Sequence, residues 1–506
     1  MSDIKEITSL ISNPTEKDKA LINKAYIFAE KAHAGHLRKS GEPYINHLFA
    51  TAKNIAELGM GPKTIAAGFL HDVIEDTKIT EEEIKREFDE EVLFLVEGVT
   101  KLGKIRYQGA SRYNESLRKL FVAMSQDIRV LIIKLCDRLH NMQTLSSIPK
   151  EKQLRIAKET LEIYAPIAYR LGIKKLQRDL EDLSFGYVYP KEYEEIKKIL
   201  KNKKEAVEAH LDEFQKNFRK KLTEGGVTKF NIDYRVKSLY SLYKKLLKYK
   251  GDVEVIYDIS ALRITVPEIA DCYRVLGIVH GNWRPLPERI KDYIASPKLN
   301  GYRSIHTTIF TGDGAIIEVQ IRTYEMHKEA EYGIASHLSY KEGIKKKTTN
   351  PNLLWIKKIL PTNSPKRSEG NRQSEALATT DIPNWVKELV EYQKEAGEEF
   401  LEDIKSDFFE ERIFVFTPKG DVIDLPKDSS VIDFAYNIHT DIGSHISGAK
   451  VNGKFVAITS ILQNGDRVEI ETKKNAKPSS KWLEFCKTTI ARRKISSFLE
   501  NKTSQT

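Results

Sequence analysis

The hydrophobic pattern changes along this chain, and that change constrains the fold more than any other feature. From residue 19 to about residue 200, apolar side chains recur at spacings of three and four, as in IRVLIIKLCDRLHNM and TLEIYAPIAYRLG, which is typical of amphipathic helices. From about residue 229 to 323 the sequence changes to β-branched runs, including VEVIYDISALRITV and AIIEVQIRT, which favour strands. We therefore expect an all-α domain followed by a mixed α/β domain.

A polar stretch separates this pair from a third region. Residues 343–381 are rich in Ser, Thr, Asn and Lys, which predicts a largely flexible connector. After one or two amphipathic helices come short strands such as IFVFTP, DVIDLP and DRVEIET, which indicate a small β-rich domain. A chain of 506 residues is too long to fold around a single hydrophobic core, so several domains are expected. The predicted segments are 1–195, 196–343, 344–405 (connector and linker helices), 406–473 and 474–506.

Composition narrows the class of protein and its compartment. The chain is 40% apolar and 30% charged, which is ordinary for a soluble globular protein. The charged amino terminus lacks a signal-peptide core and no apolar run reaches membrane-span length, so we expect a cytoplasmic protein. Cys136, Cys272 and Cys486 lack metal-ligand spacing and are interpreted as reduced packing residues. The net charge of +10 fits either an RNA partner or lysine-rich solvated helices.

Histidines and carboxylates in apolar helical surroundings form a possible metal site. They lie in GEPYINHL, FLHDVIEDT and IKLCDRLHN and comprise His47, His71, Asp72, Glu75, Asp76 and Asp137. Two imidazoles with two aspartates can hold a divalent ion and leave positions for water and phosphate, as metal-assisted phosphoester hydrolysis requires. Any one of these residues alone could instead be a helix cap or a surface group. Their number favours the metal site.

A second group of residues lies on predicted strands. In AIIEVQIRT the alternation places Glu318, Gln320 and Arg322 on the face opposite the apolar residues. Asp258 lies in another β-rich run, and two carboxylates that are carried by strands and directed at one cleft can hold Mg²⁺ on nucleotide phosphates. Cations and aromatics surround them in YRVKSLYSLYKK and PERIKDYIASPKLNGYRSIHTT. Solubility of an edge strand and a solvated lysine-rich helix are the alternatives.

The helical region resembles the hydrolase domain of the Rel/SpoT family of (p)ppGpp synthetase/hydrolases. The resemblance rests on HAGHLRKSGEPYINHL, FLHDVIEDT, GVTKL, DIRVLIIKLCDRLHNMQTL and IYAPIAYRLG. It implies an HD-type (p)ppGpp hydrolase with Mn²⁺ ligands His47, His71, Asp72 and Asp137. It also implies that Glu75 and Asp76 act on the attacking water. The expected contacts to the guanine nucleotide are Arg38, Lys39, Ser40, Asn141 and Thr144. Leu48 stands where the family usually has proline.

The α/β region resembles the synthetase domain of the same family, through YRVKSLYSLYKK, VIYDISALRI, DYIASPKLNGYRSIHTT, EVQIRT and AEYGIASH. The resemblance implies a nucleotidyltransferase-like domain that transfers pyrophosphate from ATP to the 3′-hydroxyl of GDP or GTP. It implies Mg²⁺ at Asp258 and Glu318, with Glu318 also assisting deprotonation of the hydroxyl. The expected ATP contacts are Arg235, Lys237, Lys245 and Arg263. The expected acceptor contacts are Lys298, Asn300, His306 and Tyr302, the last stacking on guanine.

Two further features bear on which activities the chain has. Arg289-Ile290-Lys291-Asp292 matches the RxKD form of bifunctional family members, whereas Arg303 replaces a usual glutamine. We therefore expect a bifunctional enzyme of the stringent response. The alternatives are a hydrolase-dominant member with weak synthetase and a non-catalytic regulator that binds tRNA or ribosomes.

Residues 406–473 resemble a TGS domain, a β-grasp module that reads the acceptor end of deacylated tRNA on ribosomes in this family. His439 matches the position that contacts the tRNA terminus. Residues 474–506 resemble the start of the family's next helical region. Long members continue into zinc-finger-like and ACT domains, so we expect either a naturally short form or a truncated one.

Overall fold

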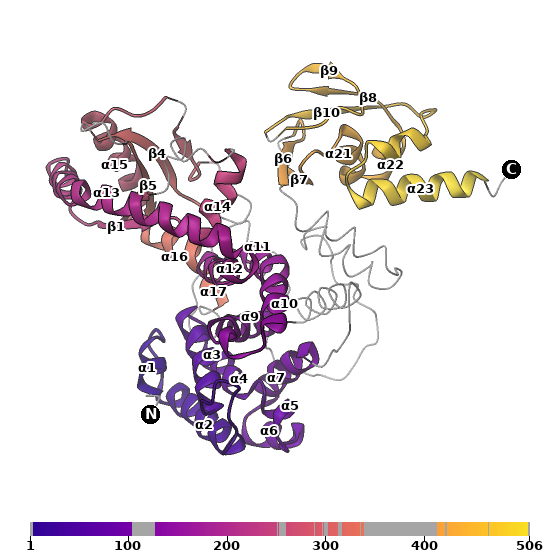
Figure 1. Cartoon of the computed structure of the whole chain (residues 1–506). Helices are drawn as coiled ribbons and strands as arrows, with labels where there is room; N and C mark the ends of the chain where they lie inside the picture. The colour runs from indigo at the N-terminus through magenta and orange to yellow at the C-terminus, as the bar shows by residue number, and fades with distance from the viewer. Residues whose placement is uncertain are drawn as a thin grey trace. The chain divides into compact units, whose positions relative to one another are not determined.

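The computed structural model describes most of the two predicted domains and the small C-terminal one. The described residues are 4–103, 127–249, 251, 260–287, 289–295, 297, 302–311, 316–333, 335–338, 412–419, 422–463 and 465–503. They belong to two units, one within residues 1–387 and the other within 388–506 (Figure 1). Each unit is described by itself. The predicted connector, residues 344–405, lies outside the described residues.

Helices make up the first part of the larger unit, as the periodicity predicted. They are α1 Ile4–Ser9, α2 Glu16–Ala32, α3 Ile45–Glu57, α4 Pro62–Leu70, α5 Val73–Asp76, α6 Glu81–Glu87, α7 Glu90–Gly103, α9 Ile128–Gln143, α10 Lys150–Glu159, α11 Ala165–Arg170 and α12 Lys174–Val188. A short 3₁₀ turn, η1 Leu145–Ser147, follows α9, and a π-helical turn, η2 Thr160–Tyr164, joins α10 to α11. The central helix α4 packs against α2, α3 and α7, and α9 packs against α3, α7 and α12. Because α4 carries apolar residues on all sides, it is buried in the middle of this bundle.

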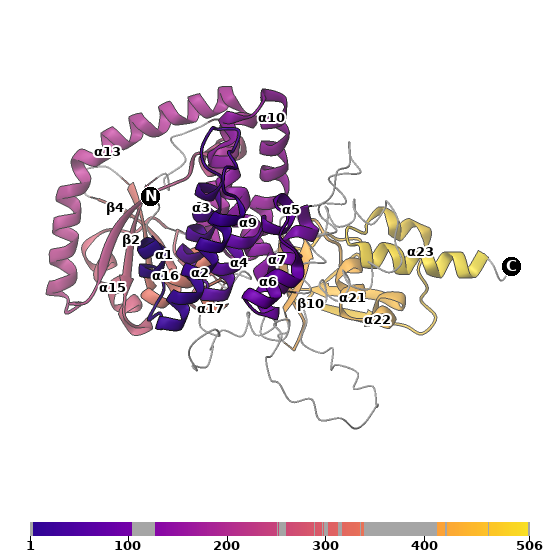
Figure 2. The same cartoon turned by 90° about the horizontal axis from the view of Figure 1, so that it is seen from below.

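One long helix joins the bundle to the sheet. Helix α13, Pro190–Glu224, leaves the bundle beside α12 and ends against α15, Ile269–Asn282 (Figure 2). The predicted segment boundary at residues 195 and 196 therefore falls inside a continuous helix. A change in composition shows where the side chains begin to pack into a different hydrophobic core. The backbone hydrogen bonds of a helix can continue across that point, from one core into the next.

The mixed α/β domain contains a five-stranded sheet in the order β1-β2-β5-β4-β3. The strands are β1 Asn231–Val236, β2 Ser260–Val266, β3 Lys291–Asp292, β4 Ile305–Phe310 and β5 Ile316–Thr323. Strands β2 and β5 are parallel, and the other neighbours are antiparallel. Residues of α13 and α15 share one apolar core with residues of the sheet, including Phe218, Val275 and Ile321. The predicted fold class, an all-α domain followed by a mixed α/β domain, is confirmed.

The alternation predicted for β5 is present, but both of its faces are covered. Val319 and Ile321 belong to the apolar core, while Gln320 and Arg322 on the other face are 6% and 0% exposed. That second face lies beneath α16, Tyr324–Tyr332, which packs against β2, β5 and α12. Helix α14, Leu239–Lys248, packs against α12 and α13, and the short α17, Ala335–Leu338, follows α16. The polar side chains of the second face are therefore held in a buried environment.

The smaller unit has the predicted β-grasp character. Its elements are β6 Arg412–Phe416, β7 Val422–Pro426, α21 Val431–Ile438, α22 Thr440–Ser444, β8 Ile446–Val451, β9 Lys454–Val456, β10 Val468–Thr472, η5 Ser480–Glu484 and α23 Thr489–Thr503. A parallel bridge between Phe416 and Arg467 connects the β6-β7 pair to the β10-β8-β9 sheet. The core side chains include Val415, Phe434 and Val468. Helix α23 packs on α21 through Ala491 and Ile495, and Cys486, which precedes α23, belongs to the same apolar cluster.

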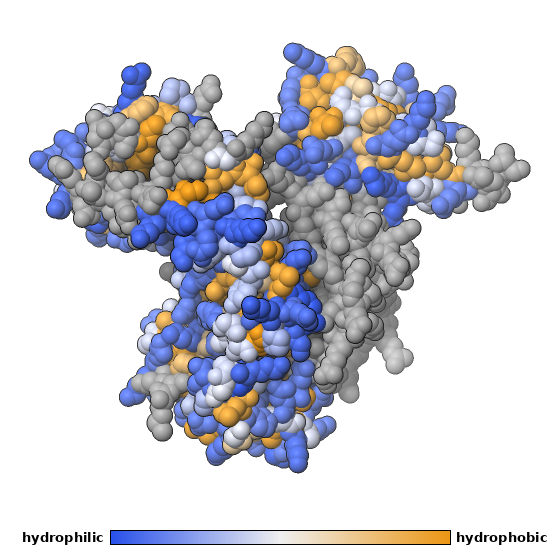
Figure 3. All heavy atoms as spheres, in the orientation of Figure 1, coloured by the Kyte–Doolittle hydropathy of each residue, from blue (hydrophilic) through white to orange (hydrophobic). Residues whose placement is uncertain are grey.

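Within the described ranges, no helix is long and apolar enough to cross a membrane. On the face of the molecule drawn in Figure 3, hydrophobic residues are interspersed with hydrophilic ones over the described helices.

Candidate metal centre and nucleotide site

The candidate metal centre lies where a helix breaks. The spacing of four residues from His71 to Glu75 and from Asp72 to Asp76 predicts one continuous helical turn, but α4 ends at Leu70 and α5 begins at Val73. Adjacent residues of an unbroken helix point about 100° apart. The break between α4 and α5 instead brings His71 Nε2 to 3.1 Å from Asp72 Oδ2.

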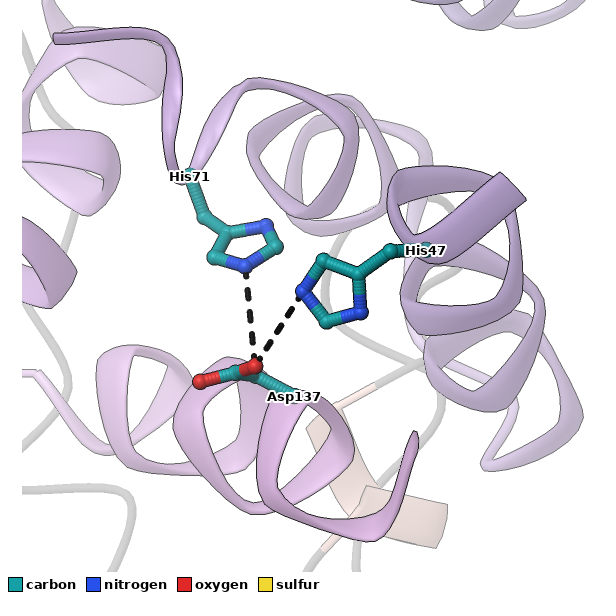
Figure 4. Close-up of side chains that lie close together, drawn as sticks. All are labelled: His47, His71 and Asp137. Carbon is teal, nitrogen blue, oxygen red and sulfur yellow. Dashed lines mark ion pairs between the residues drawn. The ribbon is translucent and has the colours of Figure 1, made fainter. Parts of the chain in front are cut away.

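Two more helices complete the group. His47 lies on α3 and Asp137 on α9. The Nε2 of His47 lies 3.3 Å from Asp137 Oδ1, and His71 Nε2 lies 3.8 Å from the same oxygen (Figure 4). The Nε2 of His47 also lies 3.5 Å from Asp72 Oδ2. His47, His71 and Asp137 are buried, with ligand atoms within 4.8 Å of one another. The structure thus brings the four predicted ligands together.

The donor atoms of this group fit a cation. The Nδ1 of His71 lies 2.8 Å from the carbonyl oxygen of Gly68, to which it donates, so Nε2 faces the carboxylates. That Nε2 atom is fully buried, and although it lies 3.1 Å from Asp72 Oδ2 it forms no hydrogen bond of suitable geometry with any described residue. A buried nitrogen without a partner is costly, whereas a metal ion between imidazole and carboxylate ligands would satisfy it.

The carboxylates around the candidate centre favour a positive charge on the groups between them. Burial opposes protonation of His71, but the carboxylates of Asp72 and Asp137 outweigh it and raise the His71 pKa to about 10. Burial would raise the pKa of Asp137, yet Lys134 and the two histidines hold it well below its usual range. Lys134 donates to the second carboxylate oxygen of Asp137 at 2.6 Å. Asp137 is therefore ionised and oriented by a neighbour one helical turn earlier.

A tyrosine connects the ligand Asp72 to the predicted catalytic carboxylates. The hydroxyl of Tyr44 lies 2.9 Å from Asp72 Oδ2 and 2.7 Å from Asp76 Oδ2, and its ring stacks on His33. Burial and then the charge of Asp72 raise the Tyr44 pKa far above its ordinary value. Glu75 and Asp76 are exposed beside the centre, where a substrate and water can reach them.

Predicted nucleotide contacts lie next to the ligands. Arg38 is half-buried, and its Nη2 donates to Asn141 Oδ1 at 2.7 Å. Lys39 and Ser40 are exposed in the turn that follows Arg38, and Thr144 ends α9. Arg38 and Asn141 are thereby tied to the proposed ligand Asp137, to which Asn141 Nδ2 donates at 2.5 Å; cations and amides of this kind could hold a nucleotide.

A second group of polar side chains lies on the sheet of the α/β domain. His306 on β4 donates from Nδ1 to Glu318 Oε1 on β5 at 2.6 Å. Its Nε2 lies 2.8 Å from the hydroxyl of Tyr302. Three predicted residues, Tyr302, His306 and Glu318, therefore form one hydrogen-bonded series. Asp258, Lys298 and Asn300 lie outside the described residues.

Arginines converge beside this series. Arg235 on β1 and Arg263 on β2 are half-buried, and Arg263 Nη1 lies 3.3 Å from Glu331 Oε1 on α16. Arg322 is fully buried beside the same carboxylate, and burial first, then Arg263, lowers its pKa to about 10. Cations outnumber carboxylates here, as expected where phosphates bind. Lys237 and Lys245 lie before and on α14 and are half-buried.

The helical domain reaches into this site. Lys174 of α12 places its Nζ 3.4 Å from the centroid of the Tyr302 ring, and Arg178, one turn later, lies 2.9 Å from Glu331. Tyr302 is only 4% exposed. A base could stack on the ring face that Lys174 covers only if that lysine moved.

Other predicted positions have structural contacts. In the RxKD tetrad, Asp292 accepts from the amides of Ile294 and Ala295 and from the hydroxyl of Tyr273. Arg303 pairs with Glu329 at 2.8 Å. His439 is exposed in the smaller unit and caps α22 by accepting from the Asp441 amide.

Sequence reasoning did not single out Tyr44, Lys134, His140, Lys174 or Arg178. A helical spacing could have revealed Lys134 and His140, because both lie three residues from Asp137 on the same face of α9. Tyr44 likewise precedes His47 by three residues. Lys174 and Arg178 gave no such signal, since their partners lie in the other domain.

Three protein families match successive parts of the chain. Residues 25–174 match the HD domain, residues 234–345 match the region found in RelA / SpoT proteins, and residues 413–472 match the TGS domain. An HD domain implies a divalent metal, and the cluster of His47, His71 and Asp137 provides a site for it.

Curated relatives match most of the chain. The chain is 44% identical over 484 residues to guanosine-3′,5′-bis(diphosphate) 3′-pyrophosphohydrolase of Aquifex aeolicus. It is 44% identical over 482 residues to GTP pyrophosphokinase of Streptomyces coelicolor and 42% identical over 482 residues to the bifunctional (p)ppGpp synthase/hydrolase RelA of Mycobacterium tuberculosis. The matches cover 95%, 94% and 94% of this chain but 65%, 55% and 62% of the relatives.

Proposed function

The chain belongs to the Rel/SpoT family, and from that premise we propose that it both hydrolyses and synthesises (p)ppGpp. The observation that carries the proposal is the buried group of His47, His71 and Asp137, in which His71 Nε2 has no hydrogen-bond partner among described residues. A hydrolytic centre of this kind, on a chain that also has a cationic α/β site, fits the two opposite activities named for its relatives.

For hydrolysis, this chain's own residues orient the nucleotide and move protons. Arg38 and Lys39 hold phosphates, while Ser40, Asn141 and Thr144 contact the rest of the guanine nucleotide. Asp76, fixed by the Tyr44 hydroxyl at 2.7 Å, and Glu75 accept a proton from the attacking water and return one to the leaving 3′-oxygen. The products are GDP or GTP and pyrophosphate.

We propose His47, His71, Asp72 and Asp137 as ligands of Mn²⁺. That ion would supply Lewis-acid stabilisation of the charge on the phosphate.

For synthesis, the residues of the sheet position two nucleotides. Arg235, Lys237, Lys245 and Arg263 hold ATP, and Tyr302, Lys298, Asn300 and His306 hold the GDP or GTP acceptor. Glu318, oriented by His306 at 2.6 Å, assists loss of the proton from the 3′-hydroxyl as it attacks the β-phosphate of ATP. Positioning and charge neutralisation account for most of such a transfer. With Asp258, Glu318 would hold Mg²⁺, which neutralises phosphate charge.

A hydrolase-dominant enzyme is the second candidate. The contact of Lys174 with the ring of Tyr302 favours it, because the acceptor base has no free access to the ring face that the lysine covers. The TGS match supports a third role, contact of the small unit with tRNA or ribosomes through residues near His439. We propose that this contact regulates the enzyme.

One experiment tests the two activities together. The purified chain is incubated with Mn²⁺ and ppGpp, or with Mg²⁺, ATP and GDP, and the nucleotides are separated by ion exchange. Asp72→Ala should abolish only hydrolysis, and Glu318→Ala should abolish only synthesis. Hydrolysis alone would establish the hydrolase-dominant reading. If neither reaction occurs but the chain binds RNA in a salt-dependent way, both enzymatic proposals fall and the chain is a binding regulator.

A further inference from the structure

His140 lies between a metal ligand and a nucleotide contact. It is on α9, 9% exposed, and its Nδ1 lies 2.8 Å from Nδ1 of His47. The same Nδ1 atom lies 3.2 Å from Nη1 of Arg38. The rings of His47 and His140 are tilted by 42° with centroids 4.9 Å apart. Nδ1 of His140 therefore lies within hydrogen-bonding distance of both His47 and Arg38.

A second path joins the same residues. Arg38 Nη2 donates to Asn141 Oδ1 at 2.7 Å, and Asn141 Nδ2 donates to Asp137 Oδ1 at 2.5 Å. Asp137 Oδ1 lies 3.3 Å from His47 Nε2. Arg38, His140, His47, Asp137 and Asn141 thus form a closed ring of polar contacts that contains two of the proposed metal ligands.

The protons in this ring can be assigned from chemistry. Arginine can only donate, since its guanidinium stays protonated and offers no acceptor. The Nδ1 of His140 must therefore accept, and the proton between the two imidazoles belongs to Nδ1 of His47. Nε2 is then the nitrogen of His47 that can lose its proton and present a lone pair, and it faces Asp72 and Asp137.

We propose that His140 is a positioning residue that fixes the metal-binding tautomer of His47. Arg38 supports this by donating to Nδ1 of His140, which keeps that nitrogen a hydrogen-bond acceptor. The proposal rests on the proposed metal-dependent hydrolysis. A ligand histidine usually donates its second N–H to an oxygen acceptor, which sets its tautomer and orientation. In this chain the acceptor is an imidazole that an arginine has fixed. Arg38 therefore contributes to metal binding without touching the metal.

A purely structural histidine is the competing explanation, because buried histidines commonly fill cores. The two explanations differ at Arg38. Removing a nearby positive charge should tighten binding of a cation if only Coulomb forces act. Removing the group that fixes the His140 tautomer should weaken it.

The test measures Mn²⁺ binding to the full chain without nucleotide, from the electron paramagnetic resonance signal of free Mn²⁺. His140→Phe should lose roughly 10–100-fold in affinity, as substitutions of such outer partners do. His140→Gln should keep most of the affinity, because its amide oxygen can accept from His47. Arg38→Met should bind Mn²⁺ more weakly than the wild type, severalfold at least.

Matched controls separate this effect from charge and packing. Lys31→Met removes an exposed cation in the last turn of α2, and His36→Phe replaces an exposed histidine outside the ring; both should leave Mn²⁺ affinity within about twofold, as expected of screened surface charges. Equal or tighter binding by Arg38→Met would overturn the proposal, whether or not His140→Phe folds. So would equal losses in His140→Phe and His140→Gln. A wild-type chain that binds no Mn²⁺ would refute the proposed hydrolytic function itself.

Discussion

Metal binding at the helical centre should release a proton from His71. The imidazole is buried beside Asp72 and Asp137, and these carboxylates outweigh burial and raise its pKa to about 10. At neutral pH this nitrogen carries a proton, which must leave before Nε2 can bind a cation.

We therefore predict that Mn²⁺ affinity rises as pH rises toward 10. With one proton displaced, the association constant should increase about tenfold per pH unit between pH 7 and 9. Isothermal titration calorimetry in buffers of different ionisation enthalpy should report about one proton released per ion. A flat affinity over this range would contradict the assignment of His71 as a protonated ligand.

Tyr44 should affect catalysis more than metal binding. Its hydroxyl bridges Asp72 and Asp76 at 2.9 and 2.7 Å, so Tyr44→Phe removes the group that holds Asp76. We predict a fall in kcat for ppGpp hydrolysis of roughly 10–100-fold with KM little changed. Tyr26→Phe, which removes a hydroxyl bonded to Glu30, is the control. An unchanged kcat would show that Asp76 does not depend on this contact.

At the scale of single residues, the motifs predicted which His and Asp side chains lie together, because adjacent His and Asp in apolar helices are unusual. They could not predict His140 or Tyr44 as partners. His140 meets His47 across 93 positions of sequence, and that proximity follows from the packing of α3 on α9, which a single sequence does not encode locally.

Helix α12 is the element that both domains share. Its residues Lys174 and Arg178 contact Tyr302 and Glu331. Farther along, Asp182 accepts from the amides of Leu239 and Tyr240 at the start of α14. These three α12 residues are four apart, so they lie on one face of the helix.

Removing the Lys174 ammonium should open the acceptor site. We predict that Lys174→Met lowers the KM for GDP in synthesis by about 2- to 30-fold, the range expected for one cation–π contact. Lys175→Met is the matched control, because Lys175 pairs with Glu57 of α3 within the helical domain. A higher KM for GDP in Lys174→Met would indicate instead that the lysine holds the nucleotide.

One buried carboxylate should hold α23 to the β-grasp domain. Asp433 accepts from Ser430 at the start of α21 and from the amides of Lys487 and Thr488 before α23, at 2.7–3.1 Å. We predict that Asp433→Ala destabilises the smaller unit by at least about 3 kcal/mol.

Hydrogen exchange of the full chain can locate this effect. The amides of α23 should lose protection in Asp433→Ala but keep it in Asp441→Ala, which removes an exposed carboxylate of the same unit. Unchanged protection would mean that apolar contacts alone hold α23.

At the scale of elements, periodicity predicted the order of helices and strands and the two faces of β5. It did not predict the break between α4 and α5, because neither His71 nor Asp72, the two residues between these helices, is a Gly or a Pro. Nor did it predict that α13 continues past residue 195, since tertiary contacts on either side determine which core each half of the helix joins.

Across the larger unit, the two proposed sites share a continuous set of packed helices. Asp137 lies on α9, α9 packs on α12, and α12 contacts Tyr302 and Glu331. Phe185 of α12 also shares an apolar cluster with Ile196 of α13 and Leu242 of α14. A shift of α12 would therefore change both sites, for which we propose opposite activities.

We predict that occupation of the synthetase site lowers hydrolysis, so that ATP is not consumed in a futile cycle. GDP with α,β-methylene-ATP should weaken Mn²⁺-dependent ppGpp binding by about 5–150-fold, the usual range of allosteric coupling. Because coupling free energies are reciprocal, ppGpp at the hydrolase site should weaken binding of the synthetase ligands by the same factor. Binding can be measured by calorimetry with Glu75→Gln to prevent turnover.

The Lys174→Met variant tests the route of this coupling. If the bound acceptor must displace Lys174 from the Tyr302 ring, α12 carries the effect, and the substitution should reduce the coupling factor toward one while Lys175→Met leaves it unchanged. Equal coupling factors in the two variants would mean that contacts other than those of Lys174 connect the sites, because the ring of Tyr302 would then be accessible without any effect on the helical domain.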